Sequence, residues 1–317
     1  MNRLDYANTG WGMAFPRYLA SWLLWPGLMI AALAGTGAGM GAGHDVLWFD
    51  GVYVAFALTI GALERAMPHE PSWLEDDRQT AANLAHTVLN KGLVQILVVV
   101  AGSVGLADAV QPPAGSTDGP WPGQLPMWAQ VLLGLVVAEF GLYWAHRLAH
   151  EFPLLWRFHA VHHSATRLWF VNTGRFHFVD TFVSIVMSQP LLYLAGAPTE
   201  IFLWVSAVTA FVGLLTHCNI EMRFGPISLL FNTPALHRWH HSMDLREGNK
   251  NYGENLTVWD LAFGTYFDAD RRPPAEIGID GPMPADFIGQ VVAPFTTRGR
   301  QDMGQEKASQ AGTGRLD

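Results

Sequence analysis

The chain has 317 residues, of which 50% are apolar and only 15% are charged, so it is more apolar than an ordinary soluble globular protein. The formal net charge of −8 gives no support to nucleic-acid binding. The single cysteine, Cys218, excludes a disulfide framework and any cysteine-based zinc or iron–sulfur site within one chain.

Apolar runs of the length that crosses a bilayer, roughly 20 residues, predict an all-α, multi-pass membrane protein. Four spans are predicted, at Tyr18 to Ala38, Val46 to Leu63, Gly92 to Val110 and Met127 to Ala145. A further pair follows at Phe182 to Leu194 and Ile201 to Leu215. Because the first of this pair is short, a membrane hairpin and two further spans both stay open. The alternative to a membrane protein is a soluble helical protein with buried helices.

The basic residues are distributed unevenly around these runs. The linkers Gly39 to Asp45, Gln111 to Pro126 and Ala195 to Glu200 contain no Lys or Arg, and all 19 basic residues lie on the other side of the predicted spans. By the positive-inside rule, the N-terminus, the histidine-rich segments and the C-terminus are predicted to be cytoplasmic.

The order of segments predicts three regions. Residues 1–125 form an N-terminal transmembrane region, and residues 126–295 form a second region with two polar, histidine-rich blocks that build a cytoplasmic helical cap. Gln111 to Pro126 is rich in proline and glycine and is predicted to be an exposed loop. Residues 296–317 are polar and are predicted to be a disordered tail.

Eight of the 13 histidines fall into three short motifs. Within a helix, positions i, i+3 and i+4 share a face, so each motif is expected to aim its nitrogens at a common point. The motifs are HRLAH with His146 and His150, HAVHH with His159, His162 and His163, and HRWHH with His237, His240 and His241.

Clustered imidazoles at this spacing indicate metal binding. Neutral imidazole binds zinc, copper, iron and nickel, and one ion rarely needs more than three or four protein nitrogens, so eight ligands imply two metals. The spacing alone admits zinc as readily as iron. No HExxH motif is present, which excludes a zinc protease of that type. The other interpretation is a polar, pH-sensitive cluster at the membrane surface.

An ordered set of motifs between Leu142 and Phe267 resembles the fatty acid hydroxylase superfamily, which includes sterol desaturases and lipid hydroxylases. The matching pieces are HRLAH, HAVHH, RFHFVD from Arg175, THCN from Thr216, HRWHH, and NYGENLTVWDLAFGTYF from Asn251. The resemblance implies a helical membrane protein with a cytoplasmic cap, two histidine-bound iron ions, dioxygen as co-substrate and an external electron donor, either cytochrome b5-like or a ferredoxin with its reductase. Zinc is possible in the isolated protein.

The resemblance also implies which residues bind metal. The eight histidines of the three motifs match the family's ligands, and His217 in THCN matches a further one. His177 in RFHFVD is an additional candidate ligand, although Phe178 stands where the family often has proline.

Several polar residues are candidates for orienting the ligands, because metal-bound histidines usually donate their other N–H to a carboxylate or carbonyl. Glu139 lies seven residues before His146, and an ionisable group within a span is a functional hypothesis by default. The remaining candidates are Asp180, Asn219, Asp244, Asn251 and Asp260. No role in metal binding is expected for His44, His69 or His86, which belong to no motif.

The function indicated is an oxidoreductase that hydroxylates or desaturates a C–H bond of a membrane lipid, such as a sterol or a fatty acyl lipid. The sequence does not choose between the two reactions, name the lipid or give the oligomeric state. A membrane acyl desaturase or carotenoid hydroxylase is a rival, disfavoured by the NYGENLTVWDLAFGTYF segment. A rival of another class is a histidine-rich metal transporter or sensor, which would need ligands along a path within the spans.

Overall fold

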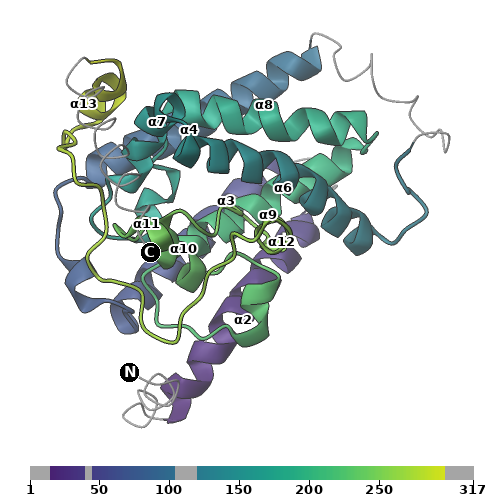
Figure 1. Ribbon diagram of the computed structural model, residues 1–317. Helices are drawn as coiled ribbons and strands as arrows, with labels where there is room; N and C mark the ends of the chain where they lie inside the picture. The colour runs from purple at the N-terminus through teal and green to yellow at the C-terminus, as the bar shows by residue number, and fades with distance from the viewer. Residues whose placement is uncertain (1–14, 40–44, 104–119, 297–317) are drawn as a thin grey trace.

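The computed structural model describes residues 15–39, 45–103 and 120–296, which form helices joined by loops and three isolated β-bridges (Figure 1). The all-α prediction is therefore confirmed for these residues. The long helices are α2 (Phe15–Gly39), α3 (Asp45–Ala66), α4 (Thr80–Ser103), α6 (Met127–Glu151), α8 (Phe178–Leu194) and α9 (Thr199–Thr216).

Shorter elements lie between and after the long helices and build the cap around the histidine motifs. The α-helices are α7 (Pro153–His163), α10 (Pro234–His240), α11 (Leu245–Gly248), α12 (Val258–Phe263) and α13 (Phe287–Val292). The 3-10 turns are η1 (Pro71–Leu74), η2 (Phe170–Gly174), η3 (Gly225–Leu229) and η4 (Ala293–Phe295).

Within the described residues, four helices are long and apolar enough to cross a membrane, namely α2, residues 47–66 of α3, α6 and α9. This confirms the prediction of a multi-pass helical membrane protein. Helix α8 is apolar but shorter. The predicted third span, Gly92 to Val110, begins inside α4, which starts earlier, at Thr80. Residues 104–110 lie outside the described part of the chain.

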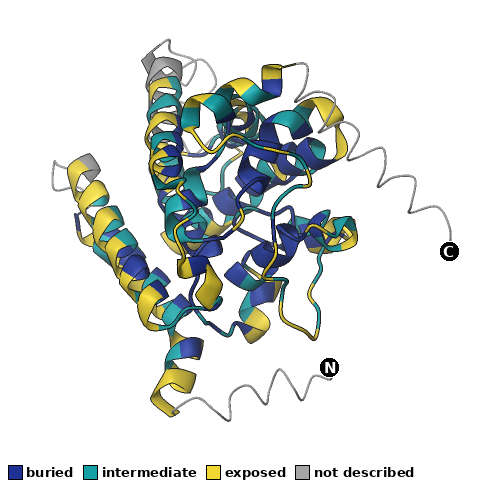
Figure 2. Cartoon of the chain, turned by 90° about the vertical axis from the view of Figure 1, so that its left-hand side faces the viewer, coloured by how far each residue is buried: buried dark blue, intermediate teal, exposed yellow. Residues whose placement is uncertain are grey.

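The main apolar core joins the N-terminal helices α2 and α3 to α9. Trp25 of α2 and Ile60 of α3 belong to the same buried cluster as Phe211 and Leu215 of α9. In the most apolar 18-residue stretch of α9, half of the residues are buried, compared with 22% in the corresponding stretch of α3. Figure 2 shows buried residues gathered in the centre and exposed residues along the outer faces of the long helices. Helix α9 is therefore the inner helix, around which α2 and α3 pack.

Helices α6 and α8 run alongside each other at close range (Figure 1). Gly141 makes this approach possible, because a Cβ atom at this position would lie 2.1 Å from the carbonyl oxygen of Met187. Helix α7 follows α6 directly and packs back against both helices. The histidine motifs of α6 and α7 are thus held at one end of the α6–α8 pair.

The structure describes only part of the predicted loop and part of the predicted tail. Of the predicted loop Gln111 to Pro126, residues 111–119 lie outside the described residues, and the Nε1–H of Trp121 donates to Oε1 of Gln130 in α6. Of the predicted tail 296–317, the described part of the chain includes only Thr296. Disorder of that tail stays a prediction.

Candidate metal centre

The junction between α6 and α7 brings the first two histidine motifs together. Helix α6 ends at Glu151, and Phe152 is extended because Pro153 follows it. Pro153 then occupies the first turn of α7, where its missing N–H costs nothing. The chain turns back over one residue, so α7 lays HAVHH against HRLAH.

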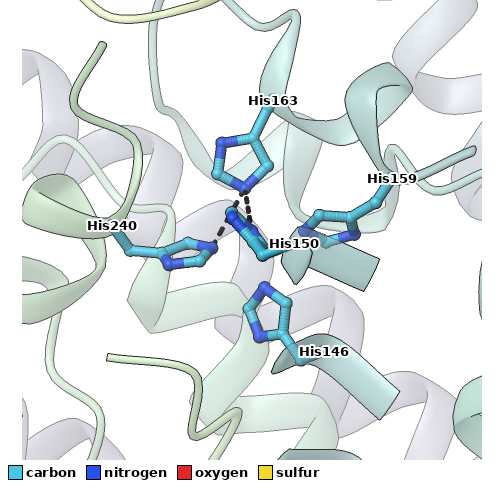
Figure 3. Close-up of side chains that lie close together, drawn as sticks. All are labelled: His146, His150, His159, His163 and His240. Carbon is cyan, nitrogen blue, oxygen red and sulfur yellow. Dashed lines mark hydrogen bonds between the residues drawn. The ribbon is translucent and has the colours of Figure 1, made fainter. Parts of the chain in front are cut away.

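Five buried histidines converge to form what we call the first histidine group (Figure 3). One ring nitrogen of each lies within 4.8 Å of one ring nitrogen of every other member. Nε2 of His163 lies 3.1 Å from Nε2 of His150 and 3.0 Å from Nε2 of His240. The members are His146, His150, His159, His163 and His240.

Four further buried histidines form the second histidine group, with the same spacing limit between their nitrogens. Nε2 of His237 lies 2.8 Å from Nε2 of His217, and Nε2 of His241 lies 3.1 Å from Nε2 of His162. The members are His162, His217, His237 and His241. His217 is the C-cap of α9, so the THCN motif brings it to the group from the end of the inner helix.

Each HxxHH motif is divided between the two groups, which differs from the expectation that its three nitrogens share one point. In α7, His159 and His163 belong to the first group and His162 to the second. In α10 and its C-cap, His237 and His241 belong to the second group and His240 to the first. Adjacent helical residues point about 100° apart, so the neighbouring histidines of each HH pair face different groups.

Hydrogen bonds on the outer side of the rings turn free nitrogens inward in the first group. Nδ1 of His146 contacts the carbonyl oxygen of Tyr252 at 2.8 Å, and Nδ1 of His240 contacts that of Lys250 at 2.8 Å. A carbonyl only accepts, so each Nδ1 carries the proton and each Nε2 keeps a lone pair. His159 makes the equivalent contact to Oδ2 of Asp180 at 2.8 Å.

This arrangement fits a metal ion. Nε2 of His146 and of His159 is buried and has no hydrogen-bond partner. Several lone pairs directed at one point repel one another unless a cation lies between them, and unsatisfied buried nitrogens are costly. The first histidine group therefore has the donor set of an imidazole-bound metal.

The second group has the same donor chemistry with fewer outer contacts. Nδ1 of His217 contacts Oδ1 of Asn172 at 2.9 Å, whereas Nδ1 of His237 and of His241 is buried without a partner. Burial, followed by the neighbouring histidines, holds the pKa of His237 and His241 well below the usual range. Their rings are therefore neutral at pH 7, which is the form that binds metals.

A loop after α11 connects the first group to two buried carboxylates. The backbone N–H groups of Tyr252 and Gly253 donate to Asp260 at 2.8 Å each. Glu139 of α6 accepts from the backbone N–H groups of Glu254 and Asn255 and from the Asn255 side chain. Because the Tyr252 carbonyl faces His146, Glu139 and Asp260 position a group that orients a histidine.

The other polar candidates act elsewhere. Asn251 has φ 55°, and its side chain bonds Leu236 and Phe267, so it stabilises the turn that begins this loop. Asn219 bonds the backbone of Glu70. Asp244 caps the short helix α11 and pairs with the exposed Arg246. The structure brings none of these three side chains to a histidine group.

His177 lies apart from both groups although it is buried. Its Nδ1 accepts from the N–H of Val179, and its Nε2 contacts the carbonyl oxygen of Val291 at 3.1 Å. The ring therefore caps α8 and links it to α13. The family resemblance selected His177 as a candidate ligand. In the structure, its two ring nitrogens instead contact backbone atoms of α8 and α13.

The histidines outside the motifs have structural partners. Nδ1 of His69 lies 2.7 Å from Oε2 of Glu221, and His86 contacts the Phe176 carbonyl and Gln290 at 3.0 Å each. Both lie outside the two histidine groups, and His44 lies outside the described residues.

Several residues that the structure brings to the two histidine groups were not selected from the sequence. Asn249 contacts Nδ1 of His150 at 3.0 Å, and Asn172 contacts His217. Arg175 is fully buried and donates to the Val161 carbonyl and the Ser164 hydroxyl, which holds the end of α7. Only Arg175 carried a signal, because it begins the RFHFVD piece.

A pocket lies against the first histidine group. Three of the group's histidines form part of its wall, namely His150, His163 and His240. The rest of the wall comes from α7, from the segment before and within α11, and from a C-terminal stretch. These residues are Trp156, Ser242, Met243, Leu245, Gly248, Gly278, Ile279 and Asp280.

Comparisons with known proteins match the region that builds this centre. A family model described as fatty acid hydroxylase matches residues 131–265. Ornithine lipid hydroxylase OlsE of Rhizobium tropici is 50% identical over 283 residues, which cover 89% of this chain and 86% of that protein. No solved structure matches the chain.

More distant relatives match a smaller part. Alkylglycerol monooxygenase of Homo sapiens is 31% identical over 49% of this chain and 32% of its own length. A very-long-chain aldehyde decarbonylase of Oryza sativa is 28% identical over 61% of this chain and 33% of its own length.

Proposed function

The chain belongs to the fatty acid hydroxylase superfamily, and from that premise we propose that it is a membrane enzyme that uses two iron ions and dioxygen to hydroxylate a membrane lipid. The observation that carries the proposal is the convergence of nine buried imidazoles into two adjacent groups. The proposed ligands are the members of these groups. His177 is left out, because both of its ring nitrogens contact backbone atoms.

A pair of iron ions, when bound, supplies the reduction of dioxygen and the attack on an unactivated C–H bond, which no side chain can perform. The chain supplies the setting. Asp180 and the carbonyl groups of Tyr252 and Lys250 hold three of the rings in fixed orientations. Burial keeps the rings neutral and excludes bulk water from the site.

We propose that the centre lies at the cytoplasmic end of α6. The support is the distribution of basic residues, because no Lys or Arg occurs in Gly39 to Asp45, Gln111 to Pro126 or Ala195 to Glu200. The catalytic region is assigned to residues 126–295 and the N-terminal membrane region to residues 1–125. Electrons would come from a separate protein, cytochrome b5-like or a ferredoxin with its reductase.

An ornithine lipid is the substrate to test first. The ornithine lipid hydroxylase matches nearly the whole chain, whereas the alkylglycerol monooxygenase matches about half of it. Sterols and simple acyl lipids are then the comparison substrates.

The test uses purified full-length protein loaded with iron, a chemical or enzymatic electron source, dioxygen and an ornithine lipid. We expect dioxygen uptake together with a product heavier by one oxygen atom, as measured by mass spectrometry. A product lighter by two hydrogen atoms would instead identify a desaturase. Tightly held metal without dioxygen uptake on any lipid would contradict the proposal and favour a metal transporter or sensor.

A further inference from the structure

Glu64 is a buried carboxylate that the proposed function does not use. It lies in α3, within the apolar residues 47–66, and only 2% of its surface is exposed. It also precedes the region that matches the family model, which begins at residue 131. Burial of an ionisable side chain in an apolar helix is costly unless the group has polar partners. The partners of Glu64 therefore indicate its role.

One oxygen atom of Glu64 joins two segments that are far apart in the sequence. Oε1 accepts a hydrogen bond from the backbone N–H of Phe170, the first residue of η2, at 2.9 Å. The same atom accepts from the backbone N–H of Asn219, two residues after His217, at 2.9 Å. A carboxylate oxygen has two lone pairs, so one atom can hold both N–H groups. Glu64 therefore fixes the spacing between η2 and the chain that follows α9.

These two segments carry the two partners of a hydrogen bond in the second histidine group. Oδ1 of Asn172, in η2, contacts Nδ1 of His217 at 2.9 Å. The orientation of the amide follows from its other bonds, because Oδ1 accepts from the Trp169 N–H and Nδ2 donates to the Arg167 carbonyl. An amide oxygen only accepts, so Nδ1 of His217 carries the proton. Nε2 of His217 then keeps the lone pair and faces Nε2 of His237 at 2.8 Å.

Other contacts hold α3 against the same two segments without using the Glu64 side chain. Pro68, just after α3, forms a β-bridge with Ile220. One turn before Glu64, a Cβ atom at Gly61 would lie 2.9 Å from the Phe170 ring, so α3 approaches η2 closely. We therefore expect α3 to stay packed in place when Glu64 is replaced, and the hydrogen bonds of Oε1 are what a substitution removes.

We propose that Glu64 is a positioning residue of the second histidine group, which sets the spacing between Asn172 and His217 and so directs Nε2 of His217 at the metal. The proposal rests on the proposed function, because the second group is assigned there as a metal site. Glu64 acts through the backbone and is not itself a ligand. The N-terminal membrane region thereby becomes part of the metal centre, although none of the proposed ligands lies in it.

The first experiment measures iron(II) binding by the metal-free, full-length protein in detergent. Samples are dialysed without oxygen against a series of free iron(II) concentrations, and bound iron is determined by elemental analysis. Glu64→Leu removes the acceptor oxygen, whereas Glu64→Gln keeps one oxygen with both of its lone pairs. Gln130→Leu is the matched control, because Gln130 is a buried residue of α6 that bonds Trp121 and lies outside both histidine groups.

For Glu64→Leu we expect the affinity for iron(II) to fall about 10–100-fold, as for the loss of other groups that orient a ligand. Glu64→Gln should stay within about threefold of the original protein, because a neutral acceptor still holds the two N–H groups. Gln130→Leu, at a distant site, should stay within about twofold. Unchanged iron(II) binding by Glu64→Leu, or an equal loss in Gln130→Leu, would overturn the proposal.

The second experiment separates positioning of His217 from a general effect on the fold. If Glu64 acts through His217, adding Glu64→Leu to His217→Ala should weaken iron(II) binding by no more than about twofold, because the ring that it orients is gone. A purely structural role would lower the affinity by the same factor in both backgrounds. That result would contradict the proposal.

Glu64→Asp keeps the test decisive if Glu64→Leu does not fold. Its side chain is shorter by one methylene group, so it keeps the charge but no longer reaches both N–H groups from the same backbone position. Loss of one hydrogen bond predicts about fivefold weaker iron(II) binding in the original background. No further loss is expected in the His217→Ala background. Iron(II) binding by Glu64→Asp equal to that of the original protein would rule out the positioning role.

Failure of the proposed function gives a different result, which is seen in the original protein. If the Glu64 variants behave as expected but the original protein oxidises no lipid, the positioning role stands and the enzymatic proposal falls. If the original protein oxidises a lipid and Glu64→Leu binds iron(II) normally, the enzymatic proposal stands and the positioning role falls. An original protein that binds no iron(II) would contradict both.

Discussion

Asp180 illustrates how a single residue acts on the centre through a histidine. It lies in the first turn of α8, and its Oδ2 accepts a hydrogen bond from Nδ1 of His159. Asp180→Asn weakens this bond and the fixed orientation of the ring. Loss of such a partner typically lowers metal affinity or activity about 10–100-fold, and we expect that loss in metal content measured by elemental analysis.

Asp244→Asn is the matched control for this substitution. Asp244 was selected from the sequence for the same reason, but it caps α11 and contacts no histidine. Its substitution should leave metal content unchanged. Equal loss of metal in both variants would argue against a specific role for Asp180.

The division of the HxxHH motifs predicts different effects for two histidines that look alike in the sequence. His240→Ala leaves four members in the first group, whereas His162→Ala leaves three in the second. Both variants should lose activity while the protein still inserts into the membrane. Metal loss should be greater for His162→Ala. Full activity in either variant would contradict the ligand assignment.

The sequence identified the individual histidines of the two groups but few of the residues that form hydrogen bonds with them. Motif spacing was sufficient to select His146, His159 and His237 as candidate ligands. Backbone carbonyl groups such as those of Tyr252 and Lys250 have no residue-type signature, and Asn249 became a partner of His150 only through tertiary folding. Asp244 and Asn219 were selected by residue type and have other roles.

Among the elements, the α6–α8 pair depends on one glycine. Gly141→Ala would place a Cβ atom 2.1 Å from the Met187 carbonyl oxygen, so the helices must separate. We expect a loss of about 1–3 kcal/mol in the free energy of unfolding, as for other overpacked sites. Thermal unfolding in detergent measures this change. Gly51→Ala in α3, where nothing lies within 4 Å of the added atom, is the control and should not be destabilised.

The helices themselves were predictable because long apolar runs and histidine spacing are local signals. The early start of α4 at Thr80 was missed, since residues 80–91 are mixed in polarity and helix formation there depends on packing against η2 and α8. The split of each HxxHH motif also required the positions of three helices at once. Helical spacing predicts which histidines lie on the same face of a helix. It does not predict that the histidines of one face are divided between two histidine groups.

For the whole molecule, acidification is expected to favour unfolding of the metal-free protein. Burial, followed by the charge of Arg238, lowers the pKa of His69 to about 4, compared with about 6.5 in an unfolded chain. Between these values the unfolded chain binds a proton that the folded protein does not, so stability falls as pH falls. The loss from His69 alone is about 2 kcal/mol at pH 5.

Thermal unfolding at pH 7 and pH 5 measures this dependence. Burial lowers the pKa of His86 in the same direction. His69→Ala removes one contribution, so its stability should change less between the two pH values than that of the original protein. An identical pH dependence in the variant would contradict the role given to His69.

The sequence predicted the membrane class and the helical architecture that the described residues show, and the family resemblance selected the segments that form the two histidine groups. It did not predict the path of residues 268–296, because they have no periodic pattern and their positions depend on separate contacts to Trp73, His69 and Trp156. The membrane orientation stays a prediction from the basic residues alone.

The sharing of α7 and α10 between the two histidine groups has a consequence for assembly. Binding of one ion would fix the direction of both helices, and the second ion would then meet ligands that are already ordered. Loading should therefore be cooperative, with half-loaded molecules scarce at every metal concentration. For the same reason, neither site could be lost by removing one helix without disabling the other, so the pair would be retained or lost as a unit.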